Sequence, residues 1–365
     1  MSGAMKGWRR IVAAAILGAL PAGAFEVPKP DDDVKDEERK LEVRVIDRNQ
    51  DVAEDIIVKA TGKLVIKPGV TLKFAAGKGL VARGVVEAVG TRDKPVVFAA
   101  RDETKGWANV ALLGNDTRGS RFEWCRFSGG RGCAVKFTAE LEYEKLLPWG
   151  DKEGGICGGA MFLTETDKVE IRSCRFEKNA AVMGGAICCW GQASPTIEGN
   201  LFVDNMGVED AGAIHAVLLS SPAITGNYFI GNAAKYGGAL HCLHRATPEI
   251  KGNYIAKNKA LSAGGGLSFF NASPNVEGNF VAENAAEKEG GGANCAAGAK
   301  PVLSGNFIGE NTDPSGDSKG LKASGGDPEK KIPPASFVEE DMAKKADVLE
   351  ALKKAGVMDL PERLK

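Results

Sequence analysis

A repeat of 26 or 27 residues is the feature that most constrains the fold of this chain. Its copies open on a proline, carry Gly-Asn near the middle and close on a second asparagine, and they occupy residues 195–205, 222–232, 248–258, 274–284 and 301–311. The prolines are spaced by 27, 26, 26 and 27 residues. A sixth copy at 169–179 keeps the register without the proline. A fixed period of this length indicates a chain built from stacked, similar coils.

A second motif, Gly-Gly-Ala-Ile or a close variant, recurs with the same period. It occupies residues 184–187, 211–214, 237–240 and 264–267, and steps of 26 residues extend it back to 158–161 and 132–135. We therefore expect a separate coil for each of these positions, including one at 132–135. The 47 glycines among 365 residues, about twice the usual share, are thereby assigned to turns between strands.

The local pattern within each repeat predicts short strands. Each copy holds runs of three to five residues in which apolar and polar side chains alternate, separated by Gly-Asn or Gly-Gly pairs. Stacked coils place equivalent residues about 4.8 Å apart, so the asparagines should form ladders. The two expected ladders are Asn200, Asn227, Asn253, Asn279 and Asn306, and Asn205, Asn232, Asn258, Asn284 and Asn311. The sequence predicts an all-β fold, a right-handed parallel β-helix (β-solenoid) of roughly ten coils over residues 45–311.

Two sets of residues resemble known β-helix proteins. The Phe-x-x-Asn and Gly-Gly-Ala-Ile repeats are similar to those of polymorphic outer-membrane proteins. The segments 66–74 and 90–98 resemble bacterial right-handed parallel β-helix proteins of the pectate-lyase-like superfamily. The resemblance implies the fold, and it implies functions that range from polysaccharide lyases and hydrolases to adhesins and other surface proteins. The sequence lacks the trio of carboxylates on neighbouring coils that the hydrolases need and the acid cluster paired with an arginine that many of the lyases need.

The two ends of the chain differ from the repeat. Residues 1–24 have a basic start, a short apolar run and small residues at the end, which is typical of a cleaved signal peptide rather than a membrane span. We expect export to the periplasm, the cell surface or the extracellular space. Residues 25–44 are interpreted as a charged lead-in, 312–336 as a linker and 337–365 as a short C-terminal α-helix that packs on the solenoid or covers its open edge.

Charge gives no reason to expect a nucleic-acid partner. Lys and Arg number 47 against 48 Asp and Glu, which leaves a net charge of −1.

The positions directly after the second motif form a row with one residue per coil. These residues are Phe162, Cys188, His215, His241, Ser268 and Asn294. We expect the row to point away from the core, with Cys188 directly below His215 and the two histidine side chains within about 6 Å of each other. The simplest interpretation is a polar row on a solvent-exposed sheet. The alternatives are a zinc or copper site formed by Cys188, His215 and His241, or an activated thiolate. Apart from that possible zinc, no cofactor is expected.

Residues 138–155 replace the strand expected in their coil and form an excursion. Tyr143 and Trp149 within it either stack on a sugar ring or pin the excursion to the coil surface. Trp190 and His244 are two further candidates for ligand binding.

The register of the repeat limits which cysteines can form disulfides. Cys189, Cys242 and Cys295 should lie in the core two coils apart, too far for a disulfide, and the same counting puts Cys125 and Cys174 two coils apart. Cys133 and Cys157 fall on adjacent coils around the excursion, two residues out of register. They either form a disulfide, which is the prediction, or remain free core thiols.

Two classes of function remain open. The favoured one is an exported, non-catalytic β-helix protein of the surface or periplasm that binds a polysaccharide or another protein along its extended face. The alternative is a polysaccharide lyase or glycoside hydrolase acting on an extended acidic glycan, with His215, His241 and Arg245 as base and charge neutraliser. The missing carboxylate set favours the first class.

Overall fold

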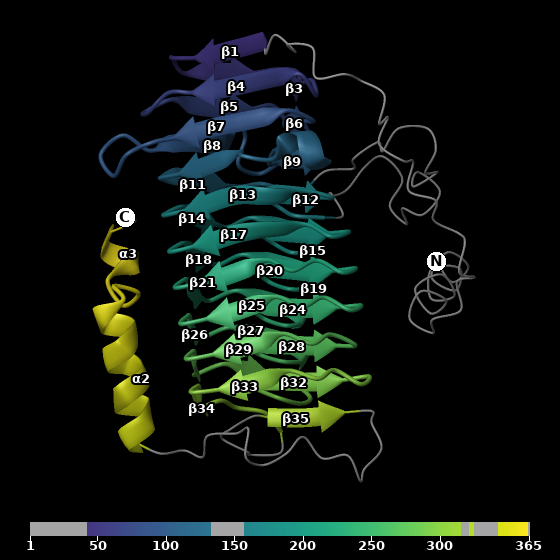
Figure 1. The fold of residues 1–365 in the computed structure, drawn as a ribbon, viewed down its shortest axis with the longest axis vertical. Helices are drawn as coiled ribbons and strands as arrows, with labels where there is room; N and C mark the ends of the chain where they lie inside the picture. Colours follow the sequence, from purple (N-terminus) through teal and green to yellow (C-terminus); the bar gives the residue numbers. More distant parts are fainter. Residues whose placement is uncertain (1–41, 133–156, 315–320, 325–341, 364–365) are drawn as a thin grey trace, which may run out of the picture. The chain divides into compact units, whose positions relative to one another are not determined.

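The computed structural model describes residues 42–132, 157–314, 321–324 and 342–363. All of these belong to one compact unit. Figure 1 shows strands stacked coil upon coil, and every strand pair recorded between neighbouring coils is parallel. The predicted all-β parallel solenoid with a short C-terminal helix is therefore confirmed. None of the helices in these ranges is long and apolar enough to cross a membrane.

Three long sheets of ten strands and one shorter sheet of five form the solenoid. Sheet 1 contains β1 (Glu42–Ile46), β4 (Gly62–Ile66), β7 (Val85–Val89), β10 (Arg121–Glu123), β13 (Asp167–Arg172), β17 (Ser194–Glu198), β21 (Ala223–Thr225), β25 (Glu249–Lys251), β29 (Asn275–Glu277) and β33 (Val302–Ser304). Sheet 2 contains β2 (Gln50–Val52), β5 (Thr71–Phe74), β8 (Val96–Ala100), β11 (Cys125–Ser128), β14 (Arg175–Glu177), β18 (Leu201–Val203), β22 (Tyr228–Ile230), β26 (Tyr254–Ala256), β30 (Phe280–Ala282) and β34 (Phe307–Gly309).

Sheets 3 and 4 complete each coil. Sheet 3 contains β3 (Ile56–Val58), β6 (Leu80–Ala82), β9 (Val110–Leu113), β12 (Met161–Thr164), β16 (Ile187–Trp190), β20 (Ile214–Val217), β24 (Leu240–Leu243), β28 (Leu267–Phe270), β32 (Ala293–Ala296) and β35 (Leu321–Ser324). Sheet 4 contains β15 (Ala180–Met183), β19 (Met206–Asp210), β23 (Ala233–Tyr236), β27 (Lys259–Ala263) and β31 (Ala285–Ala286). The helical elements are η1 (Asn115–Thr117), α2 (Met342–Lys354) and α3 (Leu360–Arg363).

The core is built from equivalent side chains that stack from coil to coil. The best example is a column of phenylalanines on sheet 2, in which successive ring centroids lie 4.7, 4.8, 4.8 and 4.7 Å apart. Its members are Phe98, Phe127, Phe176, Phe202 and Phe229. This spacing equals the distance between neighbouring strands. The repeat therefore sets the packing, because each coil buries its apolar face against the same residues of the next coil.

The two predicted asparagine ladders are present and fully buried. Asn253 shows the pattern: its Oδ1 accepts hydrogen bonds from the backbone N and the Nδ2 of Asn227, at 2.8 and 3.1 Å. Its Nδ2 donates to the carbonyl oxygen of Ile224 and to Oδ1 of Asn279, both at 2.9 Å. The amide of Asn253 thus satisfies backbone groups of the preceding coil and bonds to the amides on both sides, which explains the asparagine at these positions.

The coil expected at 132–135 does not exist as a separate level. Val110 of β9 pairs directly with Met161 of β12, so sheet 3 passes from one to the other without an intervening strand. Counting in steps of 26 therefore added a coil that sheet 3 does not contain. As a consequence, Cys125 and Cys174 lie on neighbouring strands and not two coils apart. The excursion at 138–155 lies outside the described residues.

Sheet 4 is joined to sheet 3 by the glycine pair of the second motif. Gly184, the first glycine of its copy, has a φ of 68°. A Cβ atom on the second glycine of another copy, Gly212, would lie 2.0 Å from the carbonyl oxygen of Gly238. The first position favours glycine through its backbone conformation and the second requires it through contact with the next coil. The tight turn brings the ends of the sheet 4 strands against sheet 3.

The C-terminal helices pack on sheet 2 (Figure 1). Val348 and Leu352 of α2, together with Val357, are buried against Phe280 and Phe307. Lys345 forms an ion pair with Glu310, and its ammonium group lies 5.6 Å from the centre of the Phe307 ring. The C-terminal helix therefore packs on the solenoid as expected.

Candidate functional site

One outward-facing column of side chains on sheet 2 changes character along the solenoid. On β11 and β14 the column holds Arg126 and Arg175, which are direct register partners. On the strands that follow, the partners in the same column are Leu201, Tyr228, Tyr254, Phe280 and Phe307. The column is thus cationic on two coils and apolar or aromatic on the next five.

The C-terminal helices cover the aromatic part of this column. Tyr254 and Phe280 stack with ring centroids 5.0 Å apart, and the apolar side of α2 packs over them. The apolar contact of the helices extends as far as Leu201 and the indole of Trp124. The two arginines therefore lie in the same column, directly beyond the part that the helices cover.

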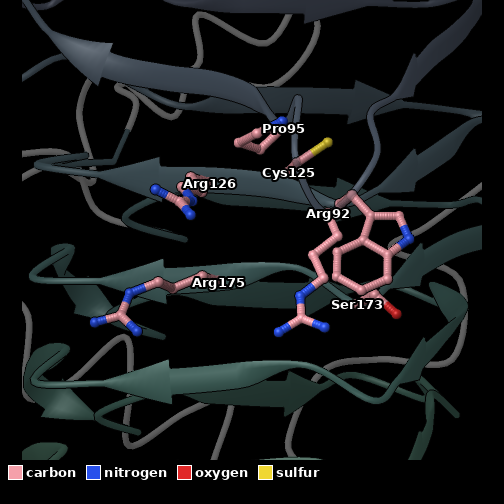
Figure 2. A pocket seen from close by; sticks show the side chains of 7 residues that line it. Arg92, Pro95, Cys125, Arg126, Ser173 and Arg175 are labelled. Atoms are coloured by element: carbon pink, nitrogen blue, oxygen red, sulfur yellow. The ribbon is translucent and has the colours of Figure 1, made fainter. Parts of the chain in front are cut away.

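The arginines surround a shallow depression. Figure 2 shows Arg92, Arg126 and Arg175 around it; Arg92 comes from the turn between β7 and β8. Trp124, Pro95, Cys125 and Ser173 complete the lining, and the enclosed space amounts to about 10 Å³. This is about what one water molecule needs, and it is far below the ~300 Å³ at which pockets for small molecules begin. A ligand would therefore lie over the depression and contact the arginines from outside.

The electrostatics of the depression favour an anion. No carboxylate is found among the described residues that line it. Glu177 lies nearby and binds Arg175, with 2.9 Å between its Oε2 and Nε of the arginine. The hydrogen bond from Arg175, with the charges of Arg175, Lys178 and Arg126, lowers the pKa of Glu177, so this group is ionised at neutral pH. Glu177 thus offsets part of the positive charge of Arg175 and Arg126.

The outer face of sheet 1 provides a contrast. Its charges alternate and pair with one another, as in the contacts of Arg121 with Glu123 and of Arg172 with Glu198. A surface whose charges are already paired offers little to an ionic ligand. The arginine cluster on sheet 2, defined as Arg92, Arg126 and Arg175, instead places three like charges around one depression.

The cluster suits a carboxylate or sulfate group. A guanidinium is planar, stays charged and can donate two parallel hydrogen bonds to such an anion. Trp124 is half-buried at the edge of the depression and offers an aromatic surface beside the charges. Charged donors next to an aromatic side chain match the acidic group and the apolar ring face of an acidic sugar.

The row after the second motif is buried, which corrects the expectation of a solvent-exposed sheet. The six side chains Phe162, Cys188, His215, His241, Ser268 and Asn294 are all at most 5% exposed. They do point away from the core column, but residues of sheet 4 lie against them. Asp210 of β19 and Tyr236 of β23 both contact the His241 ring. Alternation fixes the direction of a side chain, and it does not show that another sheet packs on that side.

The two histidines of this row have the predicted geometry and different surroundings. Cys188 is the register partner of His215, and the rings of His215 and His241 are 5.5 Å apart. His241 Nδ1 lies 2.9 Å from Asp210 Oδ1. Neither ring nitrogen of His215 has a hydrogen-bond partner among the described residues, and burial lowers its pKa to about 4. His215 is therefore neutral at pH 7 and has no surface to offer a substrate.

The same row does not present a metal centre. Within the described ranges, no group of three or more His, Cys, Asp or Glu side chains is arranged so that it could hold a metal ion. Arg245, the proposed charge neutraliser, lies on the turn after β24 and is exposed. The buried His215 and the exposed Arg245 thus have unlike surroundings.

Comparison with known proteins assigns the fold to a family. The description "Right handed beta helix region" matches residues 118–308, which is more than half of the chain. The chain belongs to the right-handed β-helix family. The predicted handedness and fold are thereby confirmed.

A curated relative of this β-helix protein shares only a short segment with it. "Protein bark beetle" of Drosophila melanogaster is 40% identical over 53 residues, which is 14% of this chain. The chain spans about 2% of the length of that relative. No solved structure matches the chain.

The remaining predicted site residues of the β-helix protein lie partly inside and partly outside the described residues. Trp190 at the end of β16 is half-buried, and the half-buried His244 ring lies 6.3 Å from the Phe270 ring. Tyr143 and Trp149 lie outside the described residues. So does Cys133, and its disulfide with the half-buried Cys157 stays a prediction.

The core cysteines occupy the predicted positions. Cys189, Cys242 and Cys295 are buried in the β-helix core, two coils apart along sheet 3.

Sequence reasoning missed the arginine cluster of the β-helix. A signal for it was present, because the tripeptide Cys-Arg-Phe occurs at 125–127 and again at 174–176. The extra coil in the counting kept these two copies apart, so their arginines were not recognised as neighbours.

Proposed function

We propose that this β-helix protein is exported, is not an enzyme and binds an extended acidic polysaccharide across the outer face of sheet 2. The observation that carries the proposal is the arginine cluster, with Arg126 and Arg175 in register on neighbouring strands and Arg92 beside them. The depression that they surround is too small to enclose a ligand, which suits contact with a polymer that lies over the surface. The signal-peptide pattern of residues 1–24 supports export.

The binding mode follows from the chemistry of the cluster. A uronate carboxylate bound by the guanidinium groups would place its sugar ring near Trp124. Hydrogen bonds between charged groups contribute about 1.5–3 kcal/mol each, so a few such contacts repeated along a polymer give useful affinity. The burial of His215 disfavours the alternative of a lyase that uses this residue as its base.

The test compares two double variants of the full chain. Arg126→Gln with Arg175→Gln removes two charges from the cluster, and Arg83→Gln with Arg245→Gln removes two exposed charges elsewhere. Binding to polygalacturonate is measured by calorimetry at low and at physiological salt, with dextran as the neutral polymer. We expect the cluster variant to lose at least roughly tenfold in affinity, the control variant to keep it, and dextran not to bind.

Two results would contradict the proposal. Equal affinity of both variants for polygalacturonate would show that binding occurs elsewhere. Release of unsaturated uronic products by the wild type, followed by ultraviolet absorbance, would show that the protein is a lyase. A loss of affinity at higher salt is expected, because the contacts are ionic and exposed.

A further inference from the structure

Two cysteines occupy consecutive steps of the first asparagine ladder. Arg126 and Arg175 are register partners, so the residues before them, Cys125 and Cys174, also face each other across neighbouring strands. The next step of the ladder is Asn200, whose Oδ1 accepts a hydrogen bond from the backbone N of Cys174 at 2.8 Å. Both cysteines are buried, with 1% and 0% exposure.

The thiols take over the hydrogen bonds of the amides. Sγ of Cys125 lies 3.1 Å from the carbonyl oxygen of Ala88, and Sγ of Cys174 lies 3.3 Å from that of Phe122. The backbone N of Cys125 donates to Sγ of Cys174 at 3.4 Å. A thiol is a weaker donor and acceptor than an amide. Hydrogen bonding alone therefore favours asparagine at both steps, and two adjacent cysteines call for another explanation.

We propose that Cys125 and Cys174 form a disulfide that joins two neighbouring coils beneath the arginine cluster. Paired parallel strands are about 4.8 Å apart, which lies within the ~4.4–6.8 Å between Cα atoms that a disulfide requires. The contact of the Cys125 amide with the Cys174 sulfur shows that the Cys174 side chain lies against the Cys125 coil. In the structure both thiols are reduced.

The oxidant is a small or protein disulfide. The thiolate of one cysteine attacks the oxidant and forms a mixed disulfide, and the other thiolate then displaces the second oxidant sulfur. The two cysteines lose two protons and two electrons, and the oxidant is reduced to two thiols. Cys125 lines the depression between the arginines (Figure 2) but is only 1% exposed, so its reaction with a small disulfide such as oxidised glutathione requires local opening of the coil. Burial raises the pKa of the Cys125 thiol, so the reaction should be faster at alkaline pH.

The disulfide has a local consequence. Cys125 and Cys174 are 49 residues apart in sequence. The bond would close a loop of this length and would fix Arg126 and Arg175, the residues that follow them, next to each other.

The experiment treats the full chain with oxidised glutathione from neutral to alkaline pH, followed by alkylation and non-reducing peptide mapping. We expect a linked peptide that contains Cys125 and Cys174. We also expect the melting temperature to rise by roughly 5–10 °C and to return when a reductant is added. The variant Cys125→Ser with Cys174→Ser should show no shift, whereas Cys157→Ser should keep it.

The mapping decides the proposal even if the double variant folds poorly, because it uses the wild type. Recovery of both residues as alkylated free thiols would overturn the proposal. Linkage of Cys125 to glutathione alone, or a shift that disappears in Cys157→Ser, would overturn it as well. No polysaccharide enters the experiment, so the result is independent of the proposed function.

Discussion

The rings of His215 and His241 lie 5.5 Å apart on neighbouring strands, yet of the two only His241 has a hydrogen-bond partner in the described part of the chain. Burial lowers the pKa of His215 to about 4, and the nearby charge of Asp210 offsets this effect only in part. One histidine therefore contributes a polar contact with Asp210, and the other is a buried polar ring that destabilises the fold in acid.

Replacement of His215 by leucine is expected to reduce the acid sensitivity of the protein. The unfolded chain binds a proton at this residue below pH 6.5, and the folded chain binds it only near pH 4. The free energy of unfolding is therefore not reduced by His215 above pH 6.5, and protonation of this residue in the unfolded chain reduces it by about 3 kcal/mol between pH 6.5 and 4. In His215→Leu this loss should be absent, and the free energy of unfolding at pH 7 should not fall, because no hydrogen bond is removed. Urea titrations at several pH values measure it; an unchanged pH dependence would contradict the assignment.

Two adjacent positions in one turn should respond very differently to substitution. Gly212→Ala places a Cβ atom 2.0 Å from a backbone oxygen of the next coil, and we expect a loss of about 3 kcal/mol or more. Ala211 has a φ of 54° where other copies have glycine, so Ala211→Gly relieves strain but removes a buried methyl group. This second variant should stay within about 1 kcal/mol of the wild type. Similar stabilities of the two variants in thermal unfolding would refute the packing argument.

Substitution of an asparagine in the interior of the ladder should strongly destabilise the fold. Asn253→Leu keeps the size of the side chain but removes four hydrogen bonds, and it takes from the backbone N of Asn227 the acceptor that Asn253 provides. We expect a loss of about 3–5 kcal/mol. The control is Asn275→Leu on β29, where the half-buried side chain is outside the ladder, with a change below about 0.5 kcal/mol. Chemical denaturation of both variants makes the comparison; a small effect at Asn253 would argue against the ladder as a source of stability.

A charged side chain placed in the contact between α2 and sheet 2 should detach the helix from the solenoid and leave the sheets intact. Leu352 is 2% exposed, and Leu352→Asp would bury a carboxylate against aromatic rings. We expect the amides of α2 to exchange rapidly with deuterium while those of sheets 1 to 3 stay protected. Lys353→Asp, at an exposed neighbouring position, should retain the protection of the helix. Loss of protection throughout the sheets would show that the helix is needed for the whole fold.

The sequence was informative where the period and the alternation act together. Asn253 and its equivalents, as well as the buried Cys189 and Cys242, could be placed because a position in one coil determines the same position in the next. The right-handed coil followed from the general preference of parallel crossovers.

Sequence reasoning was less successful where one coil departs from the repeat. Cys125 and Cys174 were separated by a coil that does not exist, since an insertion longer than one period cannot be distinguished from a degenerate repeat by counting. The burial of His215 was missed because it depends on sheet 4, whose contact with the row after the second motif the spacing does not reveal. The arginine cluster was missed for the first of these reasons, because its members are neighbours only in the correct register.

The asparagine ladders also make the solenoid modular in length. The side-chain Oδ1 of Asn227 accepts a hydrogen bond from the backbone N of Asn200 on the preceding coil. The backbone N of Asn227 donates to Oδ1 of Asn253 on the next coil, and the direction is the same at every level. An inserted coil of the same sequence would receive and return the same bonds, so duplication of 26 or 27 residues creates no unsatisfied group. Each duplication lengthens the stack by about 4.8 Å. Evolution can therefore adjust the span of such a protein in fixed increments, and an engineer can do so by copying a single coil.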